Sequence, residues 1–355
     1  MDIDELLKRM VDKRASDAHL RVPSPPILRI DGELVPQEDL PRLTPNDMTQ
    51  ALEKTTSPEQ RETFFREHEL DFAYGIPGVS RFRVSCLQQR GTLSLAFRLV
   101  SFEAPDIDKL GLPPICKTLA LKPRGLLLVT GRTGSGKSTT LAAMINYLNE
   151  TVKRNIITIE DPIEFLFHNK NCIIAQRELG SDTKSFAVAL RHALRHDPDV
   201  IVVGEMRDLD TISIAITAAE TGHLVLGTLH TSDAPQTVDR IIDIFPPAQQ
   251  QQIRLQFSQV IEAVISQALL PRATGKGRIA AFEILMGTSP VRNLIREGKT
   301  FELANAMQLG SRDGMQTLNQ ALADLVKKGL VTQEEALTKS SSPERLLRLI
   351  QFSSG

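Results

Sequence analysis

The spacing of apolar residues separates the chain into two regions. Near the start, apolar positions 3, 6, 7 and 10 predict a short amphipathic helix within residues 2–13. Short segments of β-type sequence follow, separated by glycine and proline turns, and we expect a helical insert with its N-cap at Thr44 or Asn46 between them. This pattern predicts a small α+β domain that ends near residue 100. Its β-type segments are Ile27–Ile30, Leu34–Val35, Leu70–Tyr74, Ser80–Leu87 and Leu93–Val100.

From Gly125 onward, short aliphatic runs alternate with helical periodicity. Such runs are typical of strands buried on both faces, and the alternation predicts βαβ units, a mostly parallel sheet and an α/β fold. After about residue 250 the pattern turns helical, with amphipathic helices at Thr317–Lys328 and Glu344–Ile350. Proline and glycine mark residues 101–112 as a linker, which leaves residues 1–100 and 113–355 as domains. The predicted strands are Leu126–Thr130, Ile156–Ile159, Val200–Val203 and Leu224–Thr228.

Composition narrows the class of protein. The 355 residues suit about two domains, and 41% hydrophobic with 24% charged residues is typical of globular chains. A net charge of −1 argues against a surface that is basic all over, so we expect no nucleic-acid partner. The cysteines Cys86, Cys116 and Cys172 form no CxxC pair, which suits a reducing compartment. No apolar run approaches 18 residues and the acidic start lacks a signal-peptide core, so we expect a cytoplasmic location.

A phosphate-binding loop follows the first aliphatic run of the second region. Residues Gly131–Ser138 match G-x-x-x-x-G-K-[ST], and the pattern predicts a helix over Thr139–Leu148 directly after them. The glycines let backbone N–H groups surround a phosphate, and the helix start adds positive potential. We expect Lys137 to reach the β- and γ-phosphates and Ser138 to hold Mg²⁺. The predicted nucleotide-binding residues are Arg132, Thr133, Gly134, Ser135, Gly136, Lys137, Ser138 and Thr139.

Two carboxylates end strands of the same predicted sheet. The segment Asp199–Glu205 holds four aliphatic residues, a glycine and a glutamate, and the strand Ile156–Ile159 runs into Glu160. Ligands bind at the carboxyl edge of parallel sheets, so these carboxylates can divide Mg²⁺ binding from orientation of the attacking water. We assign Glu205 to the metal together with Ser138, and either Glu160 or Glu205 can be the general base. The alternative is a surface acid that caps a turn.

Histidines and arginines supply further candidate groups. His223 and His230 bracket the strand Leu224–Thr228, which fits a γ-phosphate sensor, a hydrogen-bond relay or a purely structural pair. Phosphoryl transfer is accelerated by a mobile positive charge, and arginines of the N-terminal region can provide one. The alternation of side chains along a strand places Arg81 and Arg83 on one face. An ordinary solvent-exposed strand face is the alternative explanation for these two arginines. The candidate arginines are Arg81, Arg83 and Arg98.

Together these motifs resemble those of the secretion ATPase superfamily, the hexameric motors of type II secretion and type IV pili. Gly131–Ser138 resembles its Walker A motif, Ile159–Glu164 its aspartate box, Asp199–Asp208 its atypical Walker B motif and Thr221–Thr231 its histidine box. The resemblance covers essentially the whole chain. It implies a PAS-like N-terminal domain, a RecA-like ATPase domain with C-terminal helices, a homohexamer, ATP and Mg²⁺ as ligands, and catalytic roles for His223, His230, Arg81, Arg83 and Arg98.

One segment points to the pilus-retraction members of this superfamily. Pro290–Glu297 resembles a box linked to retraction, with Pro290 and Val291 where the family has Ala and Ile. Extension and secretion ATPases usually carry paired CxxC zinc motifs, which this chain lacks. The resemblance implies a retraction motor that acts on the inner-membrane pilus platform protein and reaches the cytoplasmic face of that membrane through this partner. An accessory retraction ATPase is the alternative within the family.

Three other classes of function compete with this interpretation. A nucleotide-dependent regulatory scaffold with little turnover is disfavoured by the presence of Glu160, Glu205 and the two histidines. A GTPase is disfavoured because Asn169–Cys172 begins like a guanine-reading NKxD motif but ends in cysteine. A DNA motor is disfavoured by the near-zero net charge and by the lack of stretches that mix basic and aromatic residues.

Overall fold

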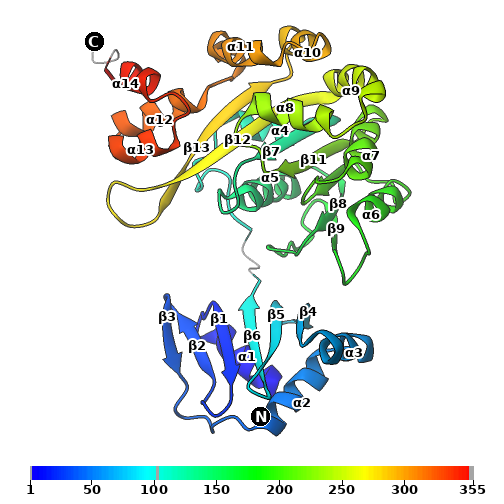
Figure 1. Cartoon of the computed structure of the whole chain (residues 1–355), viewed down its shortest axis with the longest axis vertical. Coiled ribbons are helices and arrows are strands. Elements are labelled where there is room, and N and C mark those ends of the chain that lie inside the picture. The colour runs from blue at the N-terminus through cyan, green and yellow to red at the C-terminus, as the bar shows by residue number, and fades with distance from the viewer. Residues whose placement is uncertain (1, 101–103, 352–355) are drawn as a thin grey trace. The chain divides into compact units, whose positions relative to one another are not determined.

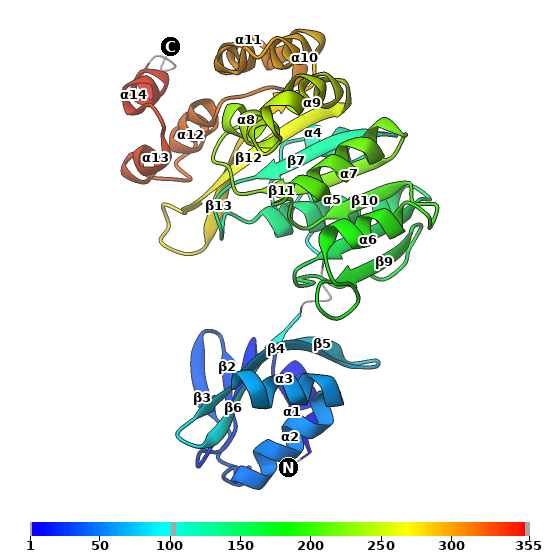
Figure 2. The same ribbon diagram turned by 45° about the vertical axis from the view of Figure 1, so that its right-hand side comes forward.

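A computed structural model of the chain describes residues 2–100 and 104–351. The described residues divide into two compact units, the first made of residues 2–100 and 163–166 and the second of residues 104–162 and 167–351 (Figures 1 and 2). The elements of the first unit are α1 (Ile3–Asp12), β1 (Asp17–Arg21), β2 (Ile27–Ile30), β3 (Glu33–Pro36), α2 (Pro45–Thr55), α3 (Pro58–Glu67), β4 (Glu69–Ile76), β5 (Ser80–Gln89) and β6 (Thr92–Leu99).

The first unit is an antiparallel sheet with helices packed on it. The strands follow the order β3-β2-β1-β6-β5-β4. The predicted first helix is confirmed as α1, and of the two predicted N-caps Thr44 is the one that begins α2, in a capping box with Asp47. In β5 the predicted alternation is confirmed, because Phe82 and Val84 are buried while Arg83 is exposed on the opposite face.

The second unit is built on a seven-stranded sheet in the order β13-β12-β7-β11-β10-β8-β9. All neighbouring strands run parallel except β13, which pairs antiparallel with β12. The predicted α/β fold with a mostly parallel sheet is therefore confirmed. Its elements up to β11 are α4 (Ile115–Ala120), β7 (Gly125–Thr130), α5 (Lys137–Thr151), β8 (Asn155–Glu160), β9 (Ile173–Glu178), α6 (Phe186–Ala193), β10 (Val200–Val203), α7 (Leu209–Glu220) and β11 (Leu224–Leu229).

The later elements of this unit are mainly helical. They are α8 (Ala234–Asp243), α9 (Pro247–Val260), β12 (Ile261–Pro271), β13 (Arg278–Met286), α10 (Ser289–Arg296), α11 (Leu303–Leu309), α12 (Leu318–Lys327), α13 (Gln333–Lys339) and α14 (Pro343–Gln351), with short 3₁₀ turns at Thr300–Glu302 and Ser311–Asp313. The predicted helices near residues 317 and 344 are confirmed as α12 and α14. None of the helices within the described ranges is both long and apolar enough to span a membrane.

One prediction for this region is wrong. The segment after residue 250 is not uniformly helical, because β12 and β13 form a long antiparallel hairpin that extends the sheet beside β7. The sequence of β12 is a nearly continuous apolar run, and such a run does not distinguish a buried strand from a buried helix by its periodicity. The hairpin matters for the site because it places β12 directly next to the strand that carries the phosphate loop.

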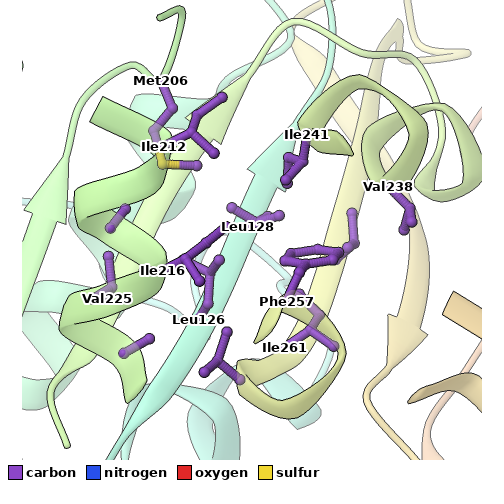
Figure 3. Close-up of a cluster of buried hydrophobic side chains, with 14 of the residues drawn as sticks. Leu126, Leu128, Met206, Ile212, Ile216, Val225, Val238, Ile241, Phe257 and Ile261 are labelled. Atoms are coloured by element: carbon purple, nitrogen blue, oxygen red, sulfur yellow. The ribbon is translucent and has the colours of Figure 1, made fainter. Parts of the chain in front are cut away.

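The central strand β7 is buried on both faces, which explains its unbroken aliphatic sequence. Leu126 and Leu128 pack with side chains of α7, α8 and α9, as Figure 3 shows around Phe257. Leu127 packs on the other face with side chains of α4 and α5. The three cysteines Cys86, Cys116 and Cys172 are also buried, and all three are free thiols.

The predicted linker, residues 101–112, is only partly described by the structure. Residues 101–103 lie outside the described residues. Residues 104–112 belong to the second unit, and Ile107 is buried in the cluster that contains α4 and α5. A PAS-like fold for residues 1–100 stays a prediction.

Candidate nucleotide site at the carboxyl edge of the sheet

The order and direction of the strands bring most predicted site residues to one edge. The phosphate loop follows β7, His230 follows β11, Glu205 follows β10 and Glu160 ends β8. These four strands are neighbours and run parallel, so their carboxyl ends meet at the same edge. With strands about 4.8 Å apart, the strand before Glu205 is about 10 Å from β7 and the strand that ends in Glu160 is about 14 Å from it.

The loop has the backbone of a phosphate cradle. Gly131, Gly134 and Gly136 have φ angles of 147°, 77° and 91°, which favour glycine. Gly136 precedes α5 and, among the described residues, no side chain caps that helix, so the N–H groups of its first turn are left for a ligand. The buried hydroxyl of Ser135 has no hydrogen-bond partner within the described residues. Donors arranged in this way fit a phosphate group.

Lys137 places its positive charge inside the loop. The side chain is 9% exposed, and its Nζ donates to the carbonyl oxygens of Gly131 at 2.9 Å and Arg132 at 3.3 Å. Ser138 is exposed one residue further along α5, and Thr139 is half-buried. Hydroxyl and carboxylate oxygens are the ligands that Mg²⁺ prefers, so the predicted pair Ser138 and Glu205 fits this ion in chemical type.

His230 connects the carboxylate of Glu205 to the phosphate loop. Its Nε2 lies 2.7 Å from Oε1 of Glu205, and its Nδ1 lies 3.5 Å from the hydroxyl of Thr133. If Nε2 carries the proton, it donates to Glu205 and leaves Nδ1 to accept from Thr133. Glu205 also accepts a hydrogen bond from Arg207. The structure thus brings together three predicted site residues, Thr133, Glu205 and His230, from three different motifs.

The turn after β10 explains how Glu205 reaches this position. The N–H of Met206 donates to the carbonyl of Thr228 at 3.0 Å, and the hydroxyl of Thr228 donates to the carbonyl of Gly204 at 2.5 Å. A Cβ on Gly204 would lie 3.0 Å from the carbonyl oxygen of Ile159, so glycine allows the close approach to β8. These contacts fasten the turn to both neighbouring strands, and Glu205 projects from it.

Glu160 is held on the other side of the same edge. Its Oε1 accepts from the hydroxyl of Thr158 at 2.6 Å and from the amide of Gln176, on β9, at 3.2 Å. The second acid is therefore fixed by its own strand and by the edge strand β9.

The structure does not bring His223 to the phosphate loop. His223 precedes β11, so it lies at the amino edge, and the six residues of β11 separate it from His230 by about 20 Å. Its Nδ1 lies 2.9 Å from the carbonyl oxygen of Ala218 and 3.2 Å from the hydroxyl of Thr221. These contacts join the end of α7 to the start of β11. Asn169–Cys172, which precedes β9, is at the same amino edge.

The three predicted arginines share a face of the N-terminal sheet. Arg83 and Arg98 are direct cross-strand partners, and Arg81 is two residues before Arg83 on β5. Arg98 forms an ion pair with Asp17 at 2.9 Å, and Arg29 lies 3.7 Å from the same carboxylate. The face is therefore rich in positive charge and carries one bridging acid.

The sequence analysis missed a polar pair on β12. Ser266 and Gln267 interrupt the apolar run of this strand and both are buried against the loop and its strand. The oxygen of Ser266 is 2.8 Å from the hydroxyl of Thr130, and the amide of Gln267 donates to the carbonyl of Ser135. The signal was present as two adjacent polar residues between the aliphatic segments 263–265 and 268–270.

The segment that resembles a retraction box forms α10. Val291 and Ile295 are buried, whereas Leu294 is half-buried. Arg292 is bound internally: it donates to the carbonyl oxygens of Gly287 and Gln259 and pairs with Glu262 at 2.8 Å. Arg292 therefore clamps α10 to the end of α9 and the start of β12.

The fold and the loop define a nucleotide-binding ATPase of the P-loop class. The family described as type II/IV secretion system protein matches residues 70–338, and this chain belongs to that family. The type IV pilus retraction ATPase PilT of Pseudomonas aeruginosa is 47% identical over 344 residues, which are 97% of this chain and 99% of that protein. The ATPase PilU of the same organism is 41% identical over 354 residues, covering 100% of this chain and 92% of that protein.

Solved structures agree with this assignment. A crystal structure of the pilus retraction motor PilT with bound ADP is similar with a TM-score of 0.89 and 48% identity, over 98% of this chain and 99% of that one. The ATPase DotB of Legionella pneumophila is similar with a TM-score of 0.83 and 28% identity, over 95% of this chain and 94% of that one.

Proposed function

We propose that this chain is a motor ATPase that hydrolyses ATP to drive retraction of a type IV pilus, and with it twitching motility. The observation that carries the catalytic part is the contact of His230 with both Glu205 and Thr133. This contact ties a candidate catalytic carboxylate to the phosphate loop at one sheet edge. The 47% identity to PilT over nearly the whole chain supports the pilus part.

The roles divide between the loop and the acids. Residues 132–139, through backbone N–H groups of the loop and the ammonium of Lys137, bind the phosphates, which stabilises charge that develops during transfer. Mg²⁺, when bound to Ser138 and Glu205, supplies charge neutralisation at the β- and γ-phosphates. Glu205 or Glu160 accepts the proton of the attacking water, and His230 holds Glu205 in position. Because His223 lies at the opposite edge, we propose that its role in this chain is structural.

The assembly and its partner rest on family resemblance. We propose a homohexamer that works on the inner-membrane pilus platform protein and reaches the cytoplasmic face of the membrane through it. A catalytic role for Arg81, Arg83 and Arg98 stays a prediction, which is tested by comparing the turnover of a residue 104–355 fragment, which keeps the buried Ile107, with that of the full chain. Equal turnover would contradict the role.

Two measurements test the function. Steady-state phosphate release by the purified chain should be dependent on ATP and Mg²⁺, and the gene should restore pilus retraction to a strain that lacks it. Nucleotide binding without turnover would instead indicate a regulatory scaffold. Turnover in vitro together with normal retraction in the deletion strain would indicate an accessory ATPase.

A further inference from the structure

Gln267 is a buried residue of β12 that touches the phosphate loop from the neighbouring strand. Its side chain is 5% exposed. The amide nitrogen donates to the carbonyl oxygen of Ser135, and the amide oxygen accepts from the hydroxyl of Thr140 at 2.9 Å. Ser135 lies in the loop and Thr140 in the first turn of α5, so one side chain binds both sides of the segment that carries Lys137.

The register of β12 fixes Gln267 at this point. Ser266 pairs with Thr130 in the parallel ladder, and their side-chain oxygens are 2.8 Å apart. Thr130 is the last residue of β7, so the next residue on β12 lies beside the start of the loop. The two contacts of Gln267 therefore follow from strand pairing and need no movement of the loop.

Two glycines of the loop, which already have positive φ angles, also pack closely against Gln267. A Cβ on Gly131 would lie 2.5 Å from the backbone oxygen of Gln267, and a Cβ on Gly136 would lie 3.1 Å from its amide nitrogen. The first distance is far below van der Waals contact, so a larger residue at 131 would force β12 away. The glycines thus permit close packing on the protein side as well as close approach of a phosphate.

The hydrogen bond to Ser135 also sets the direction of a donor. In a trans peptide the C=O and the following N–H point in opposite directions. Because Gln267 binds the carbonyl oxygen of Ser135, the N–H of Gly136 is turned away from β12. This N–H is one of the loop donors that surround a bound phosphate in a P-loop.

We propose that Gln267 is a positioning residue that holds the phosphate loop in its nucleotide-binding conformation before the nucleotide arrives. The inference rests on the proposed function as an ATPase, because it assigns a role within the same site. Preorganisation of this kind lowers the cost of ordering a site on binding, so its loss is expected to weaken nucleotide affinity as well as turnover.

The test compares Gln267→Leu with Gln316→Leu in the full chain. Gln316 is a matched control, because its amide also donates to a backbone carbonyl of the hairpin, that of Phe282 at 2.8 Å, yet the contacts of this amide do not involve the loop. The probe is a fluorescent ADP analogue, whose dissociation constant is measured beside kcat and KM for ATP. We expect Gln267→Leu to weaken analogue binding and raise KM about tenfold, the loss typical of one or two hydrogen bonds, and Gln316→Leu to change both by less than about twofold.

A second variant keeps the test informative if Gln267→Leu does not fold. Gln267→Glu retains the acceptor for Thr140 but loses the donor to Ser135, so it should weaken analogue binding by a similar factor while thermal unfolding without nucleotide confirms a folded chain. Folded variants that bind the analogue as tightly as wild type overturn the inference alone. A wild-type chain that neither binds the analogue nor hydrolyses ATP overturns the proposed function and the inference together.

Discussion

The two ends of β11 show how one strand supports two different environments. At its carboxyl end, His230 contacts Glu205 and lies beside Thr133 of the phosphate loop. At its amino end, the imidazole of His223 has its described hydrogen-bond contacts with the end of α7. Both residues are histidines next to the same buried strand. Strand direction, and not residue type, therefore decides which of the two histidines lies beside the phosphate loop.

The physical reason lies in how the parallel sheet is connected. Helices that follow the strands begin at the carboxyl edge, so their N–H groups and positive dipole ends gather there. The carboxyl edge therefore favours negatively charged groups such as phosphates. The amino edge receives the C-terminal ends of the helices, which favour positively charged groups. Substitutions at matched positions on the two edges therefore test whether the carboxyl edge alone takes part in catalysis.

The largest effect is expected for Lys137→Ala. Removing the ammonium leaves no point charge from this residue on the transferring phosphates, so ATP turnover should fall to background. The matched control is Lys153→Ala, because Lys153 is exposed just before β8 at the amino edge. Phosphate release by the two purified variants is the measurement. Near wild-type hydrolysis by Lys137→Ala would show that this loop is not the site of ATP hydrolysis.

The carboxylates should follow with a graded loss. Glu205→Gln is expected to lower kcat about 10²-fold or more while ADP still binds, because a general base or metal ligand is lost without change of shape. Glu160→Gln should cost less, since its strand is one step further from the loop. Asp199→Asn is the control, because Asp199 accepts from the N–H of Asn155 at 2.8 Å before β10 begins. A larger loss for Glu160→Gln would assign the base to β8 instead.

The two histidines give the most direct comparison of the edges. His230→Gln should lower kcat at least about tenfold, because Glu205 loses the partner that orients it. His223→Gln should change kcat by less than about twofold and act mainly on thermal stability, as expected for surface-level structural contacts. Both quantities are measured on both variants. Equal losses of kcat would show that the amino edge also takes part in catalysis.

The smallest effect is expected for Glu283, a carboxylate to which we assign a role in stability and not in catalysis. Glu283 on β13 is buried and accepts from the N–H of Ala234 at 2.8 Å and of Leu318 at 3.3 Å, at the starts of α8 and α12. Burial raises the pKa of Glu283, and the nearby Asp233 raises it further. A folded-state pKa above the unfolded value makes the stabilising contribution complete below the unfolded pKa and progressively lost as pH rises toward the folded pKa.

The variant Glu283→Gln tests this sign. It cannot ionise, so its melting temperature relative to wild type should rise as the pH increases above the ordinary carboxyl pKa of glutamate. Thermal unfolding at a series of pH values is the measurement. A difference that stays constant with pH would mean that Glu283 has the same pKa in the folded and unfolded chain.

The parts of the site that local sequence determines could be predicted. The phosphate loop is a contiguous motif that can be recognised directly in the sequence. Glu160 and Glu205 follow short aliphatic runs, and such runs are typical of buried strands. The contact of Gln267 with Ser135 joins residues 132 positions apart and depends on β12 lying next to β7, which the apolar run of β12 did not reveal. The edge on which His223 lies also follows from strand direction, since spacing alone treats both ends of β11 alike.

The burial of the three cysteines has a practical consequence for labelling this protein with fluorescent dyes. Burial raises the pKa of the Cys86 and Cys116 thiols to about 12, and it raises the pKa of Cys172 as well. The thiolate is the reactive form, so at neutral pH these side chains should resist maleimide dyes in the folded chain. A single cysteine introduced on the surface should therefore accept a fluorophore selectively, with the native thiols left in place.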